Sequence, residues 1–141
     1  MPSDDEWTTL TDYLGEGVGT KMKSALGWSS YSGKKECPQC SNWSPSKKAG
    51  TQCDRCNDKG EIESELSGNG TNESGFSGLP GGYRDDGGDY GSVGSFGGWW
   101  SSTQKFWSKL AWTRNLSYNG SVVYRYNKNK EGGLSVRCLR D

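Results

Sequence analysis

Two C-x-x-C pairs constrain the middle of this 141-residue chain more tightly than any other feature of its sequence. Cys37 and Cys40 form the first pair, Cys53 and Cys56 form the second, and twelve residues separate the two pairs. Two turns of this kind can place four thiolates around one tetrahedral ion, and all-sulfur ligation selects zinc or iron over hard cations. The spacing therefore predicts a structural zinc site with no open position for catalysis.

The segment around these cysteines, residues 33–66, is rich in Lys, Ser and Cys and has few aliphatic residues. Because it offers little apolar surface to bury, metal binding would supply its folding energy. Two disulfides are the alternative in an extracellular protein, and a redox-active pair is weaker because no thioredoxin-like βαβ pattern is present. We expect a cysteine-rich zinc-knuckle insertion at 33–66 within a single domain that spans residues 1–141.

The rest of the chain combines few aliphatic residues with many aromatic rings and glycines. Hydrophobic residues make up only 30% of the sequence, but seven Trp, seven Tyr and three Phe argue against disorder because each ring buries a large area. The 22 glycines indicate loops and tight turns. We expect a small aromatic core that includes Trp99, Trp100 or both, and an ordered glycine-rich loop over residues 67–98.

Helix signals stand at the N-terminus. Ser3 and Glu6 have the spacing of a capping box, apolar residues follow at helical spacing, and Gly15 ends the pattern. A second short helix is expected over residues 20–26.

Strand signals dominate the C-terminal part. Alternating, β-branched and aromatic residues predict strands over 111–118, 121–126 and 134–139, and Asn119-Gly120 is a strong hairpin turn signal. Two N-terminal helices followed by a C-terminal antiparallel sheet make an α+β fold.

The sequence offers no catalytic set. It has no histidine, and Cys138 stands alone in a predicted strand, where a buried small hydrophobe is the better interpretation. Asp85, Asp86 and Asp89 are oxygen donors that calcium accepts, but a solvated turn is the better interpretation of such a glycine-rich stretch. We expect a protein that is not an enzyme.

An ordered series of motifs resembles a known family. The motifs include Pro2-Ser-Asp-Asp-Glu-Trp-Thr-Thr-Leu10, Gly75-Phe-Ser-Gly-Leu-Pro-Gly-Gly-Tyr-Arg84, Gly98-Trp-Trp-Ser-Ser-Thr103 and Leu134-Ser-Val-Arg-Cys-Leu-Arg-Asp141. Outside the cysteine-rich segment, they closely resemble the Fibrobacter succinogenes major paralogous domain. The resemblance implies a C-type lectin-like fold, related to that of formylglycine-generating enzymes, in a secreted or cell-surface protein.

Several expected signals are missing. The lectin calcium signatures Glu-Pro-Asn and Trp-Asn-Asp are absent, so the resemblance does not imply calcium-dependent sugar binding. Cys138 has no candidate partner nearby, so formylglycine-generating catalysis is not implied either. The chain shows no signal peptide and no apolar run of membrane-spanning length, which leaves a cytoplasmic location open.

The same fold type serves as the variable protein of diversity-generating retroelements, which convert Asn codons to Tyr, Ser and Asp codons. Residues 113–130 are rich in these residue types and resemble such a variable region. Because alternate strand residues share a face, we expect a framework of Leu116, Val123, Arg125, Val136 and Cys138, with Arg125 buried and paired. The expected ligand-binding residues are Tyr90, Phe106, Trp107, Thr113, Asn115, Ser117, Asn119, Tyr124, Tyr126 and Lys128.

These features predict a non-catalytic module that displays a polar-aromatic face to a protein or carbohydrate ligand. A nucleic-acid binder is one alternative, because residues 104–141 hold eight Lys/Arg against only Glu131 and Asp141, and a zinc knuckle is predicted. A relative of the formylglycine-generating enzymes is the other alternative.

Overall fold

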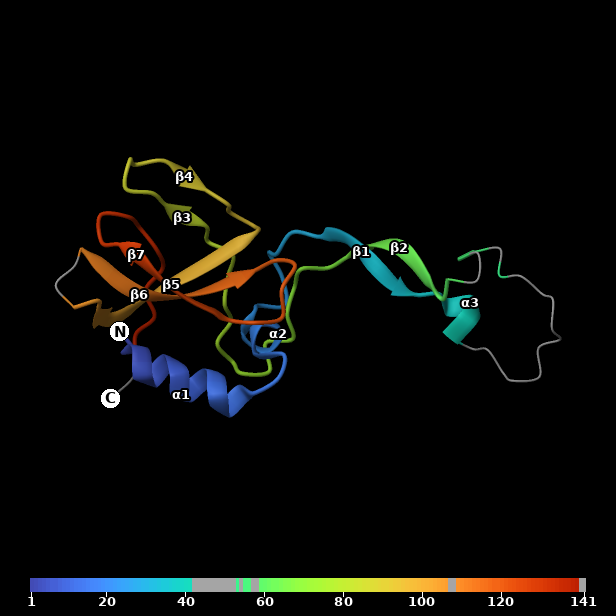
Figure 1. The fold of residues 1–141 in the computed structure, drawn as a ribbon, viewed down its shortest axis with the longest axis horizontal. Coiled ribbons are helices and arrows are strands. Elements are labelled where there is room, and N and C mark those ends of the chain that lie inside the picture. The colour runs from blue at the N-terminus through green and yellow to red at the C-terminus, as the bar shows by residue number, and fades with distance from the viewer. Residues whose placement is uncertain (42–52, 54, 57–58, 107–108, 140–141) are drawn as a thin grey trace. The chain divides into compact units, whose positions relative to one another are not determined.

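The computed structural model describes residues 1–41, 53, 55–56, 59–106 and 109–139. The chain divides into two compact units. The first, here called the body, comprises Met1–Ser30 and Ser67–Asp141, and the second, the cysteine unit, comprises Tyr31–Leu66. Mixed helices and antiparallel strands make the protein α+β, as predicted from the sequence (Figure 1).

Two short helices open the body. Helix α1 (Asp4–Leu14) begins at Ser3, whose hydroxyl accepts from the Glu6 backbone N–H while the Glu6 carboxylate accepts from the Ser3 N–H, so the predicted capping box is formed. Helix α2 (Val18–Met22) is shorter than the helix predicted over residues 20–26 and begins two residues earlier.

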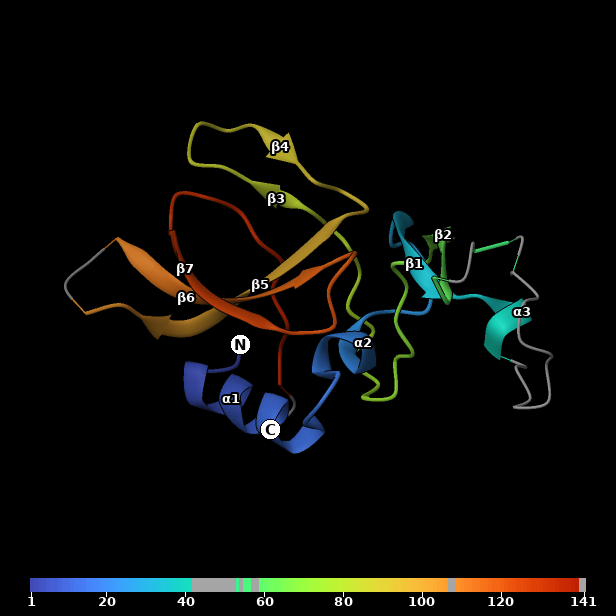
Figure 2. The same cartoon turned by 45° about the vertical axis from the view of Figure 1, so that its right-hand side comes forward.

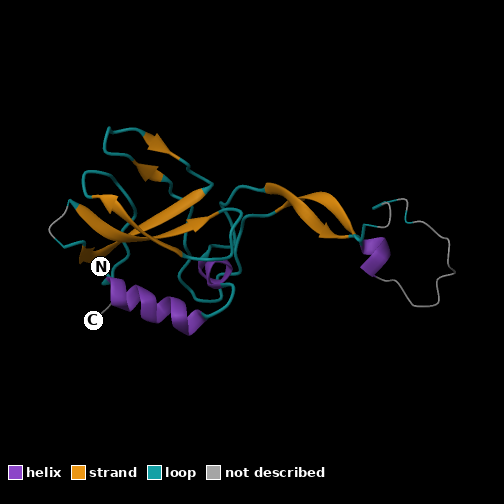
Figure 3. Cartoon of the chain, in the orientation of Figure 1, coloured by secondary structure: helices purple, strands orange, loops and turns teal. Residues whose placement is uncertain are grey.

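The body carries a three-stranded antiparallel sheet in the order β5-β6-β7, and α1 lies along one of its faces in both views (Figures 1 and 2). Its strands are β5 (Phe96–Gln104), β6 (Leu110–Ser117) and β7 (Tyr124–Asn129). Two short strands, β3 (Tyr83–Arg84) and β4 (Tyr90–Gly91), pair separately. Much of the remaining body is loop, as the glycine content indicates (Figure 3).

The strand predicted over residues 134–139 is wrong. Only isolated bridges occur there, because Gly133 exchanges hydrogen bonds with Arg84 while Ser135 bonds to β5. The backbone therefore changes partner within two residues and builds no ladder. Val136 and Cys138, expected as framework, are both exposed.

Aromatic rings form most of the body's core. Phe76 makes edge-to-face contacts with Trp7 at 5.5 Å and with Trp99 at 5.1 Å between ring centroids. Trp99 is buried, as predicted, whereas Trp100 is half-buried. Gly97 allows this packing, since a Cβ there would lie 2.7 Å from the Trp99 ring and 2.9 Å from the backbone oxygen of Leu79.

A buried charge network fastens α1 to the sheet. The Asp4 carboxylate accepts hydrogen bonds from Arg114, whose side chain is 4% exposed, and from Arg125 at 2.7 Å. Arg114 also donates to the Thr8 hydroxyl at 2.9 Å, and the Arg125 guanidinium lies 3.5 Å from the centre of the Trp112 ring. Arg125 is thus paired, as predicted, but its side chain remains 47% exposed rather than buried.

The cysteine unit contains an antiparallel ribbon that the sequence did not reveal. Strands β1 (Tyr31–Glu36) and β2 (Glu61–Leu66) pair along their whole length, from Tyr31 opposite Leu66 to Glu36 opposite Glu61. The short helix α3 (Pro38–Ser41) follows β1 directly. The ribbon brings the two ends of the cysteine-rich segment together.

Candidate ligand pocket and metal centre

Strand alternation gives the β5-β6-β7 sheet two chemically different faces. On the inner face, Trp99, Arg114 and Leu116 are buried. Thr113 and Asn115 alternate with them on β6 and therefore belong to the outer face. They lie opposite Tyr126 and Tyr124 of β7, respectively, which are 56% and 41% exposed.

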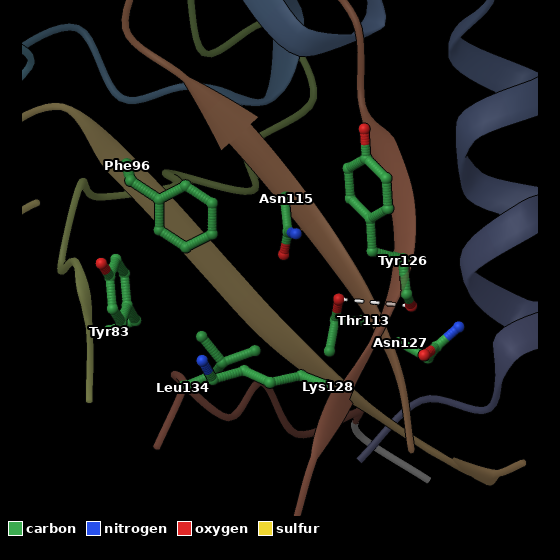
Figure 4. A pocket seen from close by; sticks show the side chains of 8 residues that line it. All are labelled: Tyr83, Phe96, Thr113, Asn115, Tyr126, Asn127, Lys128 and Leu134. Carbon is green, nitrogen blue, oxygen red and sulfur yellow. Dashed lines mark hydrogen bonds between the residues drawn. The ribbon is translucent and has the colours of Figure 1, made fainter. Parts of the chain in front are cut away.

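A pocket of about 250 Å³ lies on this outer face, here called the strand pocket (Figure 4). Aromatic rings, two amides, a hydroxyl, one lysine and one leucine line it. The lining residues are Tyr83, Phe96, Thr113, Asn115, Tyr126, Asn127, Lys128 and Leu134.

Strand β6 contributes two polar side chains to this pocket, those of Thr113 and Asn115. The Thr113 hydroxyl donates to the Tyr126 carbonyl at 3.3 Å, which the dashed line in Figure 4 marks. Asn115 projects from β6 into the space between Phe96 and Tyr126. Its Oδ1 atom is buried and has no hydrogen-bond donor, a deficit that is rare in folded proteins and favours a ligand or water as partner.

One positive charge lies in the strand pocket. The Lys128 side chain extends from β7 toward Tyr83, and its Nζ atom lies 4.8 Å from the centre of that ring (Figure 4). Tyr83 in turn packs edge-on against Phe96 at 5.8 Å. No carboxylate in the described ranges forms an ion pair with Lys128, so its charge is available to a ligand.

The cysteine unit gathers its four thiols at one point. The Sγ atoms of Cys37, Cys40, Cys53 and Cys56 all lie within 4.8 Å of one another. The Cys37–Cys53 and Cys40–Cys56 sulfur pairs are 3.7 and 3.3 Å apart, so neither pair forms a disulfide, whose sulfurs lie about 2.05 Å apart. Four ligands of a tetrahedral zinc ion at about 2.3 Å would have sulfurs about 3.8 Å apart. The cluster is compatible with a structural metal such as zinc.

Tight turns place these sulfurs. Within the first pair, the Cys40 N–H donates to the Cys37 carbonyl at 2.8 Å, and after the second pair the Lys59 N–H donates to the Cys56 carbonyl at 3.0 Å. Gly60, in a left-handed conformation at φ 75°, accepts from the Cys37 N–H and closes the two turns together.

The thiols of the cluster differ in acidity. Hydrogen bonding with the backbone N–H of Cys56 is the main reason that the pKa of Cys53 falls to about 7. A thiol with this pKa is about half ionised at neutral pH, and the thiolate is the form that binds metal. Hydrogen bonds with the thiols of Cys56 and Cys53 instead raise the pKa of Cys40.

Comparison with known proteins identifies the family but no individual relative. The sequence model of the Fibrobacter succinogenes major domain matches residues 1–140. The chain belongs to this family. No curated protein and no solved structure matches it, so no relative's activity bears on this member of the Fibrobacter succinogenes major domain family.

The strand pocket of this family member includes only part of the face expected from the sequence. Thr113, Asn115, Tyr126 and Lys128 line it. Thr113, however, was expected to point outward and is only 1% exposed, because its short side chain lies beneath the larger ones and bonds to the neighbouring strand. It forms the floor of the pocket rather than a displayed contact.

The other expected residues lie elsewhere. Tyr124 stacks on Tyr126 at 6.0 Å but does not line the pocket. The Ser117 hydroxyl donates to Asn119 Oδ1 at the end of β6. The remaining three are Tyr90 and Phe106, which are 81% and 83% exposed, and Trp107, which lies outside the described residues.

Four lining residues escaped the sequence-based prediction: Tyr83 and Phe96, which begin β3 and β5, Asn127 on β7, and Leu134 in a loop. A signal for two of them, Phe96 and Leu134, exists in Gly98. A Cβ there would lie 2.8 Å from both Phe96 and Leu134, so this glycine lets both side chains lie over the sheet. A strand glycine between aromatic residues is a mark of such close approach.

Proposed function

We propose that this domain is a non-catalytic binding module whose body holds a small ligand, or one end of a larger ligand, in the strand pocket. The observation that carries the proposal is the convergence of exposed Tyr126, unpaired Lys128 and the buried, donorless Asn115 oxygen on one concavity. Pockets that combine aromatic walls with a few convergent polar groups are the usual form of ligand sites.

The residue types of the outer face support recognition rather than chemistry. Tyrosine provides rigid contact area at low entropic cost, and amides and hydroxyls provide adaptable hydrogen bonds. No pair of groups in the described lining of the pocket has the form of a nucleophile with an adjacent base. We therefore favour binding over the formylglycine-generating-type alternative.

Binding on an array of immobilised glycans and peptides tests this function. We expect the wild-type protein to bind a subset of the array, Tyr126→Ala to lose those signals, and Tyr13→Ala to retain them. Tyr13 is a matched control because it is a tyrosine on α1 that is 87% exposed and does not line the strand pocket. Identical patterns for wild type and Tyr126→Ala would contradict the proposal.

We propose further that the four cysteines hold one structural zinc ion. Burial of Cys37, Cys53 and Cys56 and the mutual approach of all four sulfurs support a closed site with no coordination position for water. Iron accepts the same ligands, so metal analysis of the purified protein decides between the two metals.

We also propose that the body has a C-type lectin-like fold and serves as a variable protein of a diversity-generating retroelement at the cell surface. Support comes from the helices that precede the sheet and from the strand pocket, which draws five of its residues from the Asn- and Tyr-rich segment 113–130. The test is a comparison of copies of this domain within one genome, where variation confined to residues 104–131 is expected.

The nucleic-acid alternative loses part of its support in the described structure. Arg114 and Arg125 belong to the basic excess of the C-terminal part, but both are bound to Asp4, and Lys109 pairs with Glu131 at 3.1 Å. Fewer cations then remain for a phosphate backbone, which needs several of them.

None of the helices in the described part is long and apolar enough to cross a membrane.

A further inference from the structure

A second pocket adjoins the strand pocket on the body. This loop pocket, of about 310 Å³, is lined by Gly81, Gly82, Tyr83, Arg84, Tyr90, Gly133, Leu134 and Ser135. Tyr83 and Leu134 line both pockets. A ligand that fills one pocket therefore reaches the wall of the other, and a longer ligand can occupy both.

Each pocket contains one cation. Lys128 lies in the strand pocket and Arg84 in the loop pocket, and neither forms an ion pair with a carboxylate of the residues that the structure describes. The Arg84 Nη1 group donates to the Glu131 carbonyl at 3.1 Å, which holds the guanidinium in place and leaves its other donors for a ligand.

Two acidic side chains of the turn between β3 and β4 form contacts of their own. Asp85 Oδ1 accepts from the Asp89 backbone N–H at 2.9 Å, and Asp86 lies at 3.5 Å from the amide of Asn129. These contacts tie the turn between β3 and β4 to itself and to β7. Neither Asp85 nor Asp86 lines either pocket.

The walls exclude a simple apolar occupant. Leu134 is the one aliphatic side chain that lines the two pockets, whereas tyrosines line both and Asn115 has an unmatched acceptor. A sugar ring offers an apolar C–H face that packs on an aromatic ring and hydroxyls that donate to a buried oxygen. Tyr, whose ring is apolar and whose tip is polar, suits both needs. A hydrophobic peptide side chain would leave the polar groups unpaired.

From these observations we infer that the two pockets are adjacent subsites for an acidic oligosaccharide, with Lys128 and Arg84 each holding one carboxylate of consecutive uronic-acid units. The inference rests on the proposed function of the strand pocket and adds to it the loop pocket, the ligand class and the minimum length of two units. Charge-assisted hydrogen bonds to carboxylates supply the discrimination against neutral sugars.

Calorimetric titration of the full chain with galacturonate, digalacturonate and neutral galactobiose tests the inference. We expect digalacturonate to bind about tenfold more tightly than galacturonate, which makes one charge-assisted hydrogen bond fewer, and about a hundredfold more tightly than galactobiose, which makes two fewer. Lys128→Gln should weaken both acidic sugars about tenfold, whereas Arg84→Gln should weaken only digalacturonate. Lys35→Gln, on β1 of the cysteine unit, removes an exposed charge and should change nothing.

The outcomes separate this inference from the proposed function. Equal affinity for digalacturonate and galactobiose, or equal affinity for the monomer and dimer, would overturn the acidic two-subsite assignment. Absence of any digalacturonate binding would overturn it as well. In each case array binding that depends on Tyr126 leaves the strand pocket standing as a site for another ligand, such as a neutral glycan or a peptide.

Discussion

The body and the cysteine unit are stabilised by different means. In the body, buried Trp7, Phe76 and Trp99 pack edge to face and provide an apolar core. Among the described residues of the cysteine unit, the buried cluster consists of Cys37, Cys53 and Cys56, with Cys40 and Ile62 partly buried against it. The body therefore has the apolar burial that folding needs, whereas for the cysteine unit we propose that metal binding by its thiols supplies this stability.

The two units are expected to differ in the source of their folding free energy. Burial of apolar surface stabilises by roughly 25 cal/mol per Å², so several large rings outweigh one partly buried isoleucine. Binding of a structural zinc ion by small peptides is worth roughly 10–16 kcal/mol at neutral pH, so one bound ion would offset the small apolar burial among the described residues of the cysteine unit. The two units should accordingly respond to different perturbations.

The largest expected effect is loss of the cysteine unit on metal removal. A strong chelator, or Cys37→Ser, should unfold residues 31–66 while the body keeps its structure, because the body's core contains no metal ligand. Two-dimensional NMR should show collapse of the resonances of this unit alone. Metal analysis of the untreated protein should give about one zinc ion per chain.

Cys138→Ser provides the matched control for this prediction. Cys138 is exposed and belongs to the body, so its replacement should leave the metal content unchanged. Mass spectrometry that finds two disulfides among the other four cysteines, with no bound metal, would contradict the zinc site.

The next largest effect should come from Trp99→Ala in the body. Trp99 is 6% exposed and packs on Phe76, so the cavity left behind should cost about 3–5 kcal/mol of unfolding free energy. Denaturant unfolding followed by aromatic fluorescence measures this. Zinc content should not change, and a coupled loss of zinc would show that the two units do not fold independently.

Local sequence signals predicted elements well where they act over short range. The capping box of Ser3 and Glu6 fixes the start of α1, and period-two alternation located β6. The hairpin signal of Asn119-Gly120 was followed by a later strand start than predicted, at Tyr124 rather than at residue 121. The strand expected at 134–139 failed because hydrogen-bond partners far along the chain, such as Arg84 and Gly98, divide that segment.

In the candidate sites too, features set by short-range sequence signals could be predicted, whereas features set by long-range packing could not. The cluster of four cysteines could be predicted because C-x-x-C spacing is a local geometric requirement of a four-thiolate site. Most β6 and β7 members of the strand pocket followed from alternation, but Phe96 and Leu134 did not, since only tertiary packing brings them over Gly98. The ribbon of β1 and β2 was missed because its sequence is charged and lacks β-branched residues other than Ile62.

A smaller and pH-dependent effect is expected at Asp4. Burial raises the pKa of this carboxyl, but the hydrogen bonds and charges of Arg125 and Arg114 more than offset burial and lower the pKa below its ordinary value. A carboxyl whose folded-state pKa is lowered stabilises the fold above its unfolded pKa of about 3.9, and this stability is lost as the pH falls further. Acid should therefore destabilise the body below about pH 4.

Asp4→Asn should remove this contribution, costing about 1–3 kcal/mol at neutral pH because Arg114 keeps its bond to the Thr8 hydroxyl. Urea midpoints at pH 7 and pH 3 measure the difference, which should be smaller for the variant than for the wild type. Glu6→Gln is the control, because Ser3 also lowers the pKa of Glu6 but that side chain is exposed. An unchanged pH dependence in Asp4→Asn would rule out the network as its source.

The smallest effect on stability should be found on the outer face of the sheet. Tyr124 and Tyr126 are 41% and 56% exposed and stack on each other, so Tyr126→Ala should change the unfolding free energy by no more than about 0.5 kcal/mol. Leu116→Ala, on the inner face of neighbouring β6, should cost about 2–5 kcal/mol because Leu116 is 1% exposed. Ligand binding should show the reverse order, with Tyr126→Ala the more damaging of the two when measured on folded protein. If Tyr126→Ala destabilises the body as much as Leu116→Ala does, the ring serves the fold and the outer face is not a display surface.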